Sequence, residues 1–125
     1  MAPQSATGWL LRAHVRKTQR RLPEALEDAT HALEVEPRSA YTWLLRGELL
    51  ALSGKLEPAL ADFDRGLLFE PRNAPALGLR ARVRFALGRR AEALADARRA
   101  LELTPEGMPF HQDFTTLVRE LERRQ

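Results

Sequence analysis

The chain has 125 residues, 44% hydrophobic and 30% charged, which is enough for one globular domain with its own hydrophobic core. It has no cysteine, no signal-peptide pattern and no apolar run long enough to span a membrane, so we expect a soluble, cytoplasmic protein without disulfides. Its net charge of +3 is the small excess of 20 basic over 17 acidic residues, so no strong single-sign field is expected.

A period of 34 residues runs through the sequence and predicts three similar helix pairs. Pro37, Pro71 and Pro105 follow one another at this interval, and Ala, Leu and Asp residues recur in the same phase. Each proline lacks an N–H and therefore ends the second helix of its pair. The predicted helices cover residues 6–19, 22–35, 40–53, 56–69, 74–87 and 90–103.

The residues between these helices have the chemistry of caps and turns. Ser39 and Asn73 each precede the first helix of a pair, where a side-chain oxygen accepts a backbone N–H bond. Ser5 has the same phase, so it is either a simple N-cap or the trace of a longer array. Gly54 and Gly88 suit the left-handed turn between the two helices of a pair, and the first pair has no glycine there.

Two segments need the repeat register to be interpreted. Residues 77–87 alternate apolar and other side chains, which taken alone indicates a half-buried strand, but the register predicts a helix. After Pro105, the spacing of apolar residues from Phe110 to Leu121 predicts an amphipathic helix at about 110–124. We expect this helix to cap the array with its polar side in solvent.

The repeated residues resemble the tetratricopeptide repeat, a helix-turn-helix unit with this period. Trp9 and Trp43 match its aromatic position, and small residues recur at its helix-contact positions. The resemblance implies an all-α, right-handed superhelical solenoid in one domain of residues 1–125, with repeats at 6–39, 40–73 and 74–107. It also implies a scaffold or adaptor, because such repeats bind partner proteins on the concave surface lined by their first helices.

The resemblance places the partner-binding residues on the first helix of each pair. Most of them are apolar, so we expect a groove that receives a peptide or an amphipathic helix. Leu44 and Leu45 are expected at its centre, and Glu48 meets a base of the partner or pairs with Arg82 or His14. The predicted partner-binding residues are Leu10, Leu11, His14, Tyr41, Leu44, Leu45, Glu48, Leu52, Leu79, Arg82 and Phe85.

One subclass of this family binds the C-terminal carboxylates of heat-shock chaperones through a clamp of Lys, Asn and Arg side chains. The matching positions here hold Leu10, His14, Leu45, Pro75 and Leu79. Because His14 alone offers a donor, we expect that the chain does not act as such a carboxylate clamp. A specialised chaperone that holds a secreted or assembling partner stays open as an alternative.

RNA binding is the second alternative, because basic residues gather in the first predicted repeat. Arg12, Arg16 and Arg20 recur at helical spacing, with Lys17 and Arg21 beside them. A solvated basic face is the commoner meaning of such a pattern, and nearby carboxylates offset its charge. We therefore expect weak, salt-sensitive binding of nucleic acid at most.

Three arginines and three aspartates also recur at the 34-residue interval: Arg12, Arg46 and Arg80, and Asp28, Asp62 and Asp96. An arginine packs its apolar stem while its guanidinium reaches a carboxylate, so we predict a structural ladder of Arg–Asp pairs. If the residues pair, we expect Arg46→Leu to cost little stability and Asp62→Ala to cost more.

No residues have the spacing of a catalytic or metal site. His14, His31 and His111 are the only histidines, and none stands at ligand spacing from another. A cysteine nucleophile, a glycine-rich phosphate loop and a nucleophile elbow are all absent from the sequence. We therefore predict a non-enzyme without cofactor or metal, whose partner is a protein or peptide, with self-association through the groove or the array ends as a further option.

Overall fold

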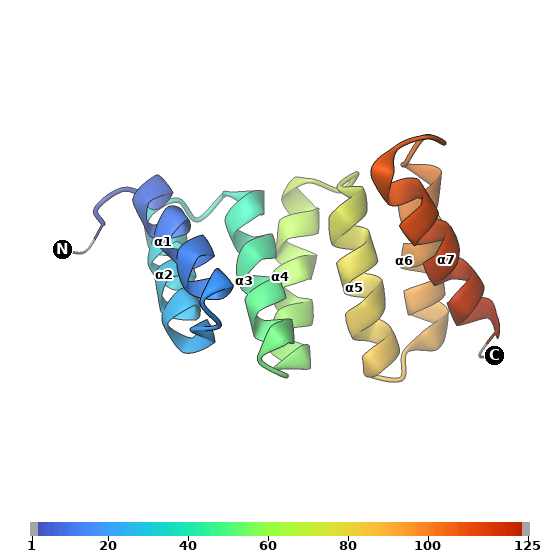
Figure 1. The fold of residues 1–125 in the computed structure, drawn as a ribbon, viewed down its shortest axis with the longest axis horizontal. Helices are drawn as coiled ribbons and strands as arrows, with labels where there is room; N and C mark the ends of the chain where they lie inside the picture. The colour runs from blue at the N-terminus through green and yellow to red at the C-terminus, as the bar shows by residue number, and fades with distance from the viewer. Residues whose placement is uncertain (1–2, 124–125) are drawn as a thin grey trace. The chain divides into compact units, whose positions relative to one another are not determined.

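The computed structural model describes residues 3–123, and every regular element in that range is an α-helix (Figure 1). The six helices predicted from the period are confirmed to within one residue at each end. The predicted cap helix is also present, although residue 124 lies outside the described residues. The helices are α1 (Ala6–Thr18), α2 (Leu22–Val35), α3 (Ala40–Leu52), α4 (Leu56–Phe69), α5 (Ala74–Ala86), α6 (Arg90–Glu102) and α7 (Pro109–Arg123).

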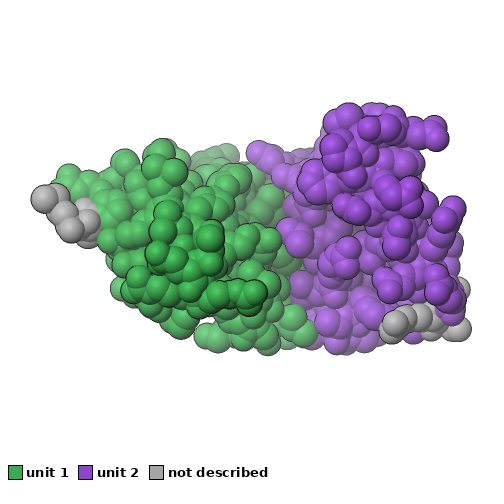
Figure 2. All heavy atoms as spheres, in the orientation of Figure 1, with its two compact units in different colours: residues 1–69 green, residues 70–125 purple. Residues whose placement is uncertain are grey.

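The chain divides into two compact units, residues 1–69 and residues 70–125, coloured separately in Figure 2. In unit 1, α1 packs on α2 and α3 packs on α4, and α3 also packs on α2. In unit 2, α5 packs on α6 and α6 packs on α7, and the three helices share one core. Each unit therefore buries its own apolar helix faces.

The first helices of the three repeats begin at the predicted caps. At each one a side-chain oxygen accepts a hydrogen bond from the backbone N–H three residues later, which satisfies a donor that has no partner within the helix. The predicted caps are thus confirmed. The bonds run from Gly8 N to Ser5 Oγ (3.1 Å), from Thr42 N to Ser39 Oγ (3.3 Å) and from Ala76 N to Asn73 Oδ1 (3.0 Å).

The turns inside the repeats all use a left-handed residue. Gly54 and Gly88 have φ angles of 79° and 81°, as their positions predicted. Arg20 takes the same place in the first repeat with a φ of 63°. Because a side chain with a Cβ is strained in this conformation by about 1–2 kcal/mol, the first turn is held by its surroundings and not by its own preference.

Small residues let the helices of a pair approach closely, as the repeat resemblance implied. A Cβ added at Gly47 would lie 3.0 Å from the ring of Phe63, which is fully buried. A Cβ added at Gly66 would overlap the side chain of Leu44. The tight packing of α3 on α4 therefore depends on two glycines.

The segment 77–87 and the segment after Pro105 are both mainly helical, as the repeat register and the apolar spacing predicted. Residues 77–87 lie almost entirely in α5, so the strand-like alternation is indeed carried by a helix. On α7 the apolar stripe is buried from Phe114 to Leu121. Phe110, the first residue of the predicted stripe, is instead exposed and stacks its ring on Phe114.

Each repeat contains the predicted Arg–Asp pair, which confirms the ladder. In all three, the arginine donates from Nε and Nη2 to the two oxygens of a buried aspartate, a bidentate geometry that is strong for this type of bond. The Nε and Nη2 distances are 3.1 and 2.9 Å for Arg12–Asp28, 2.8 and 3.0 Å for Arg46–Asp62, and 2.8 and 2.9 Å for Arg80–Asp96.

Candidate functional site

The first candidate surface lies along α1 and α3 of unit 1 and is here called the α1–α3 surface. Two polar contacts join the two helices there. The His14 ring Nε2 is hydrogen-bonded to the Tyr41 hydroxyl, and Lys17 Nζ donates to Glu48 Oε1 at 2.8 Å. Glu48 therefore meets a lysine that the sequence interpretation had not paired with it, and His14 is engaged elsewhere. These contacts make the surface more polar than the apolar groove that the sequence predicted.

The two leucines expected at the centre of the groove lie in the helix packing. Leu45 is only 5% exposed and belongs to the core formed with Ala13, Ala25, Ala29 and Leu49. Leu44 is half-buried and lies over Gly66 of α4. Their expected role as the open centre of the surface is thus corrected, because α3 turns both toward neighbouring helices. The predicted residues that remain open on α3 are Tyr41 and Leu52.

Leu11 differs in solvent exposure from its equivalent in the next repeat. It is 64% exposed, whereas Leu45, 34 residues later, is 5% exposed. Leu45 is covered by α1 and α2, and no helix precedes α1 among the described residues to cover Leu11 in the same way. Val15 on the next turn is exposed as well, which sequence reasoning missed although it matches the buried Leu49.

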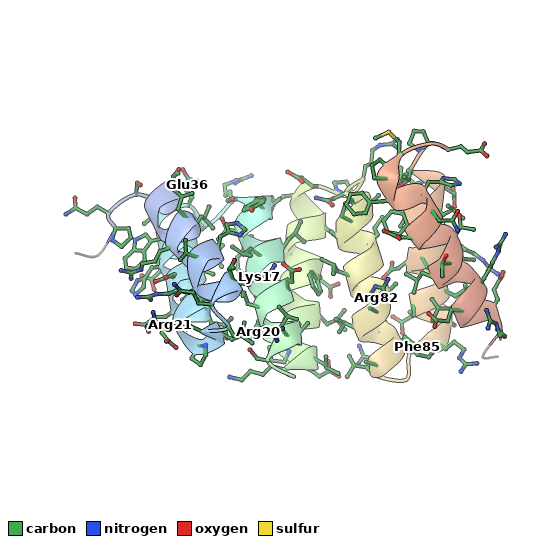
Figure 3. The ribbon with its side chains drawn as sticks, in the orientation of Figure 1. Lys17, Arg20, Arg21, Glu36, Arg82 and Phe85 are labelled. Atoms are coloured by element: carbon green, nitrogen blue, oxygen red, sulfur yellow. The ribbon has the colours of Figure 1, made fainter. Side chains whose placement is uncertain are left out.

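The second candidate surface is a cleft in unit 2, here called the α5–α7 cleft. Arg82 and Phe85, both selected from the sequence, lie on the C-terminal half of α5 (Figure 3). They line an open cleft of about 260 Å³ together with Leu117, Glu120 and Leu121 of α7. Arg82 is exposed, whereas Phe85 is half-buried against the core of the unit.

The residues of α7 in this cleft are the ones that the sequence interpretation missed. Leu117 and Leu121 were recognised as an apolar stripe but assigned to capping only. The 34-residue period gave no signal for their role, because α7 begins after the last full repeat and its register against α5 is not set by that period. Leu79, also predicted, lies half-buried on α5 but does not line the cleft.

The basic face of α1 is largely neutralised by contacts within unit 1. Arg12 and Arg16 both donate hydrogen bonds to Asp28. The bond between Arg12 and Asp28 raises the pKa of Arg12. At the following turn Arg21 donates to Glu24 at 2.8 Å and thereby lowers the pKa of that carboxyl group. Lys17 is bound to Glu48, so most of the predicted basic patch is engaged within the protein. Arg20 and Arg21 follow the end of α1 (Figure 3).

We therefore expect a labelled single-stranded RNA to bind weakly at low salt and to lose most of its affinity near physiological salt. The physical reason is that few free cations remain to release counterions from the phosphates. Fluorescence anisotropy titrations at two salt concentrations measure this directly. Glu48→Gln, which releases Lys17, should raise the low-salt affinity. Tight RNA binding that resists salt would contradict the assignment of these bases to internal ion pairs.

The sequence also predicted neither a metal site nor a membrane span. Within residues 3–123, no three His, Asp or Glu side chains are grouped closely enough to hold a metal ion. None of the helices in the described range is both long and apolar enough to cross a membrane.

Known proteins resemble the chain in sequence over one repeat and in fold over nearly all of it. Residues 74–106 match the sequence model of the tetratricopeptide repeat, and no curated protein sequence matches the chain. The first tetratricopeptide repeat domain of Spaghetti (RPAP3), solved with the HSP90 peptide SRMEEVD, has a TM-score of 0.88 and 22% identity over 97% of this chain and 93% of that chain.

Two further solved structures show the same fold. The TPR2B domain of yeast Sti1, in a pHsp70 complex, has a TM-score of 0.90 and 20% identity over 96% of this chain and 98% of that one. The Yersinia enterocolitica type III secretion chaperone SycD, with a peptide of the translocator YopD, has a TM-score of 0.86 and 13% identity over 93% of this chain and 91% of that one. At these identities the likeness establishes the fold alone.

Proposed function

We propose that this chain is a tetratricopeptide repeat protein and acts as a non-catalytic interaction module that binds a peptide or an amphipathic helix of a partner protein. The observation that carries the proposal is the α5–α7 cleft. There, two residues selected from the sequence as partner contacts line an open recess with leucines of a different helix. Concave sites with apolar walls and a few polar groups are typical of ligand recognition.

The lining of the α5–α7 cleft defines the chemistry of its ligand. Phe85 is the accessible apolar wall, with the buried Leu117 and Leu121 behind it, and the volume of about 260 Å³ suits one apolar side chain of the partner. Arg82 and Glu120 carry opposite charges in the same lining. We therefore propose an apolar anchor residue flanked in the peptide by an acidic and a basic residue, whose charges fix its orientation.

The α1–α3 surface supplies a separate contact in this proposal. Tyr41 and Leu52 are exposed there, and tyrosine combines a large apolar ring with a hydroxyl group that tolerates water. We assign Tyr41 as the main contact of this surface, in place of the half-buried Leu44 and the buried Leu45. The Lys17–Glu48 ion pair beside it offers both signs of charge to a partner.

The similar structures support peptide binding but not a shared ligand. Those of RPAP3, Sti1 and SycD were solved with an HSP90 peptide, with pHsp70 and with a YopD peptide, respectively. At the clamp positions of this chain His14 offers the donor, and it is already bound to Tyr41. We therefore propose a ligand other than a chaperone C-terminus. A specialised chaperone would use the same two surfaces and would differ in the partner it holds.

A random peptide library displayed on phage and selected on the full chain tests this function. We expect selected peptides to carry an apolar anchor, and Phe85→Ala to weaken their binding about 10- to 100-fold, as is usual for a central aromatic contact. Arg82→Glu should also weaken the binding, and it tests the same cleft at an exposed residue without disturbing the core. Isothermal titration calorimetry measures both affinities, and circular dichroism checks the fold.

Phe110→Ala is the matched control, because Phe110 is also a phenylalanine of unit 2 but is exposed outside the cleft lining. We expect its affinity for the selected peptides to match that of the wild type. Tyr41→Ala then shows whether the α1–α3 surface takes part. Undiminished peptide affinity in folded Phe85→Ala and Arg82→Glu proteins would refute the α5–α7 cleft as the binding site.

A further inference from the structure

In the second repeat, the Arg–Asp ladder lacks the second arginine that the first and third repeats have. In the first repeat Arg16 Nη1 donates to Asp28 at 3.2 Å, in addition to the bonds from Arg12. In the third repeat, inside unit 2, Arg84 Nη1 donates to Asp96 at 2.8 Å in the same way. The equivalent position of the second repeat is Leu50, which has no hydrogen-bond donor in its side chain.

Asp62 consequently receives one guanidinium group where its two equivalents receive two. In the part of the chain that the structure describes, the hydrogen bonds to its carboxylate come from Arg46. A carboxylate has about four acceptor positions, so two remain after the bidentate bond. Because Asp62 is buried, these positions lie in a region where an additional charged hydrogen bond is strong.

A cleft of about 600 Å³ opens at this place, between α2, α3 and α4 of unit 1. We call it the α2–α4 cleft. Asp62 and Leu50 both line it, so the buried carboxylate and the position that lacks the second arginine face the same cleft. Its other walls include Pro23, Glu27, Thr30, Lys55, Pro58 and Ala61.

We propose that the α2–α4 cleft binds an arginine side chain of a partner polypeptide, whose guanidinium takes the place that Arg16 and Arg84 fill in their own repeats. The apolar walls formed by Pro23, Leu50 and Pro58 accept the stem of that arginine. This site is distinct from the α5–α7 cleft and does not depend on it.

The acceptor positions left open on Asp62 favour a cation, and the lining as a whole carries no net charge. Arg46 is neutralised by Asp62, and Glu27 matches the charge of Lys55, so no net positive charge attracts a phosphate or carboxylate. The molecule itself shows that two guanidiniums share one aspartate at Asp28 and at Asp96. An arginine is preferred to a lysine because the planar guanidinium is weakly hydrated and donates several bonds in one plane.

Three short peptides test the site on the full chain: acetyl-Gly-Arg-Gly-amide, its lysine counterpart and its citrulline counterpart, which has the same shape without the charge. We expect the arginine peptide to shift the backbone NMR signals of Thr30, Leu50 and Asp62, with weaker shifts from lysine and none from citrulline. Equal shifts from arginine and citrulline, or shifts confined to other residues, would overturn the proposal. So would stronger shifts of these signals by inorganic phosphate.

Leu50→Arg supplies the missing guanidinium from within the chain. We expect it to raise Tm and to reduce the affinity for the arginine peptide at least tenfold, whereas Leu50→Met, a change of similar volume, keeps the affinity. Ala61→Phe narrows the cleft at an exposed residue and should also reduce binding, which keeps the test decisive if Leu50→Arg does not fold. Wild-type affinity in a folded Leu50→Arg or Ala61→Phe protein would contradict the proposed site.

Discussion

Replacing Arg46 with leucine is expected to lower the free energy of unfolding by about 3–5 kcal/mol, the usual cost of leaving one member of a buried ion pair without its partner. The Asp62 side chain is 6% exposed and would stay in the interior without the guanidinium that now satisfies both its oxygens. Urea unfolding followed by circular dichroism measures the change.

Arg12→Leu is the matched control for this experiment. Arg12 makes the same bidentate bond to Asp28 and lies 5.0 Å from the centre of the Trp9 ring, as Arg46 lies 5.2 Å from that of Trp43. Arg16 remains bound to Asp28 after the change, so the loss of stability should be clearly smaller. Equal losses in the two variants would mean that the second arginine contributes nothing.

From the burial of the two side chains we expect the opposite order of stability losses in the second repeat from the order expected from the sequence. Arg46 is 24% exposed, four times the exposed fraction of Asp62, and its long side chain can turn its charge to solvent once the aspartate is gone. Asp62→Ala should therefore cost less than Arg46→Leu. The sequence identified the two partners but not which of them is the more deeply buried.

Replacing Phe63 with alanine is expected to destabilise the protein by about 3–5 kcal/mol, because it removes a large buried ring and leaves a cavity. Phe63 is the largest of the fully buried side chains in the described residues, and it fills the space left by Gly47 on the facing helix. Thermal unfolding of the purified variant measures the loss.

Leu68→Ala provides the comparison on the same helix. Leu68 is 68% exposed, so its truncation should change the free energy of unfolding by no more than about 0.5 kcal/mol. Both residues belong to unit 1, which removes any difference caused by separate unfolding of the two units. A loss at Phe63 as small as that at Leu68 would show that the helices of this pair repack around the smaller side chain.

The features that depend on local chemistry or on repetition could be predicted without the fold. The prolines, the caps at Ser39 and Asn73 and the glycine turns act within a few residues of their own positions, so their effect is visible without the fold. The Arg–Asp ladder was also predictable, because three equivalent pairs at one interval reveal a contact that a single pair would not.

Tertiary structure alone decided how deep each equivalent residue lies and what it meets. Leu11 and Leu45 share one position of the repeat, yet the first is exposed and the second buried, because burial depends on which helix packs alongside. The pairing of Lys17 with Glu48 and the approach of α7 to Phe85 likewise join residues that no period relates. A repeat therefore fixes which residues correspond, whereas the packing of neighbouring helices decides which of those residues a partner can reach.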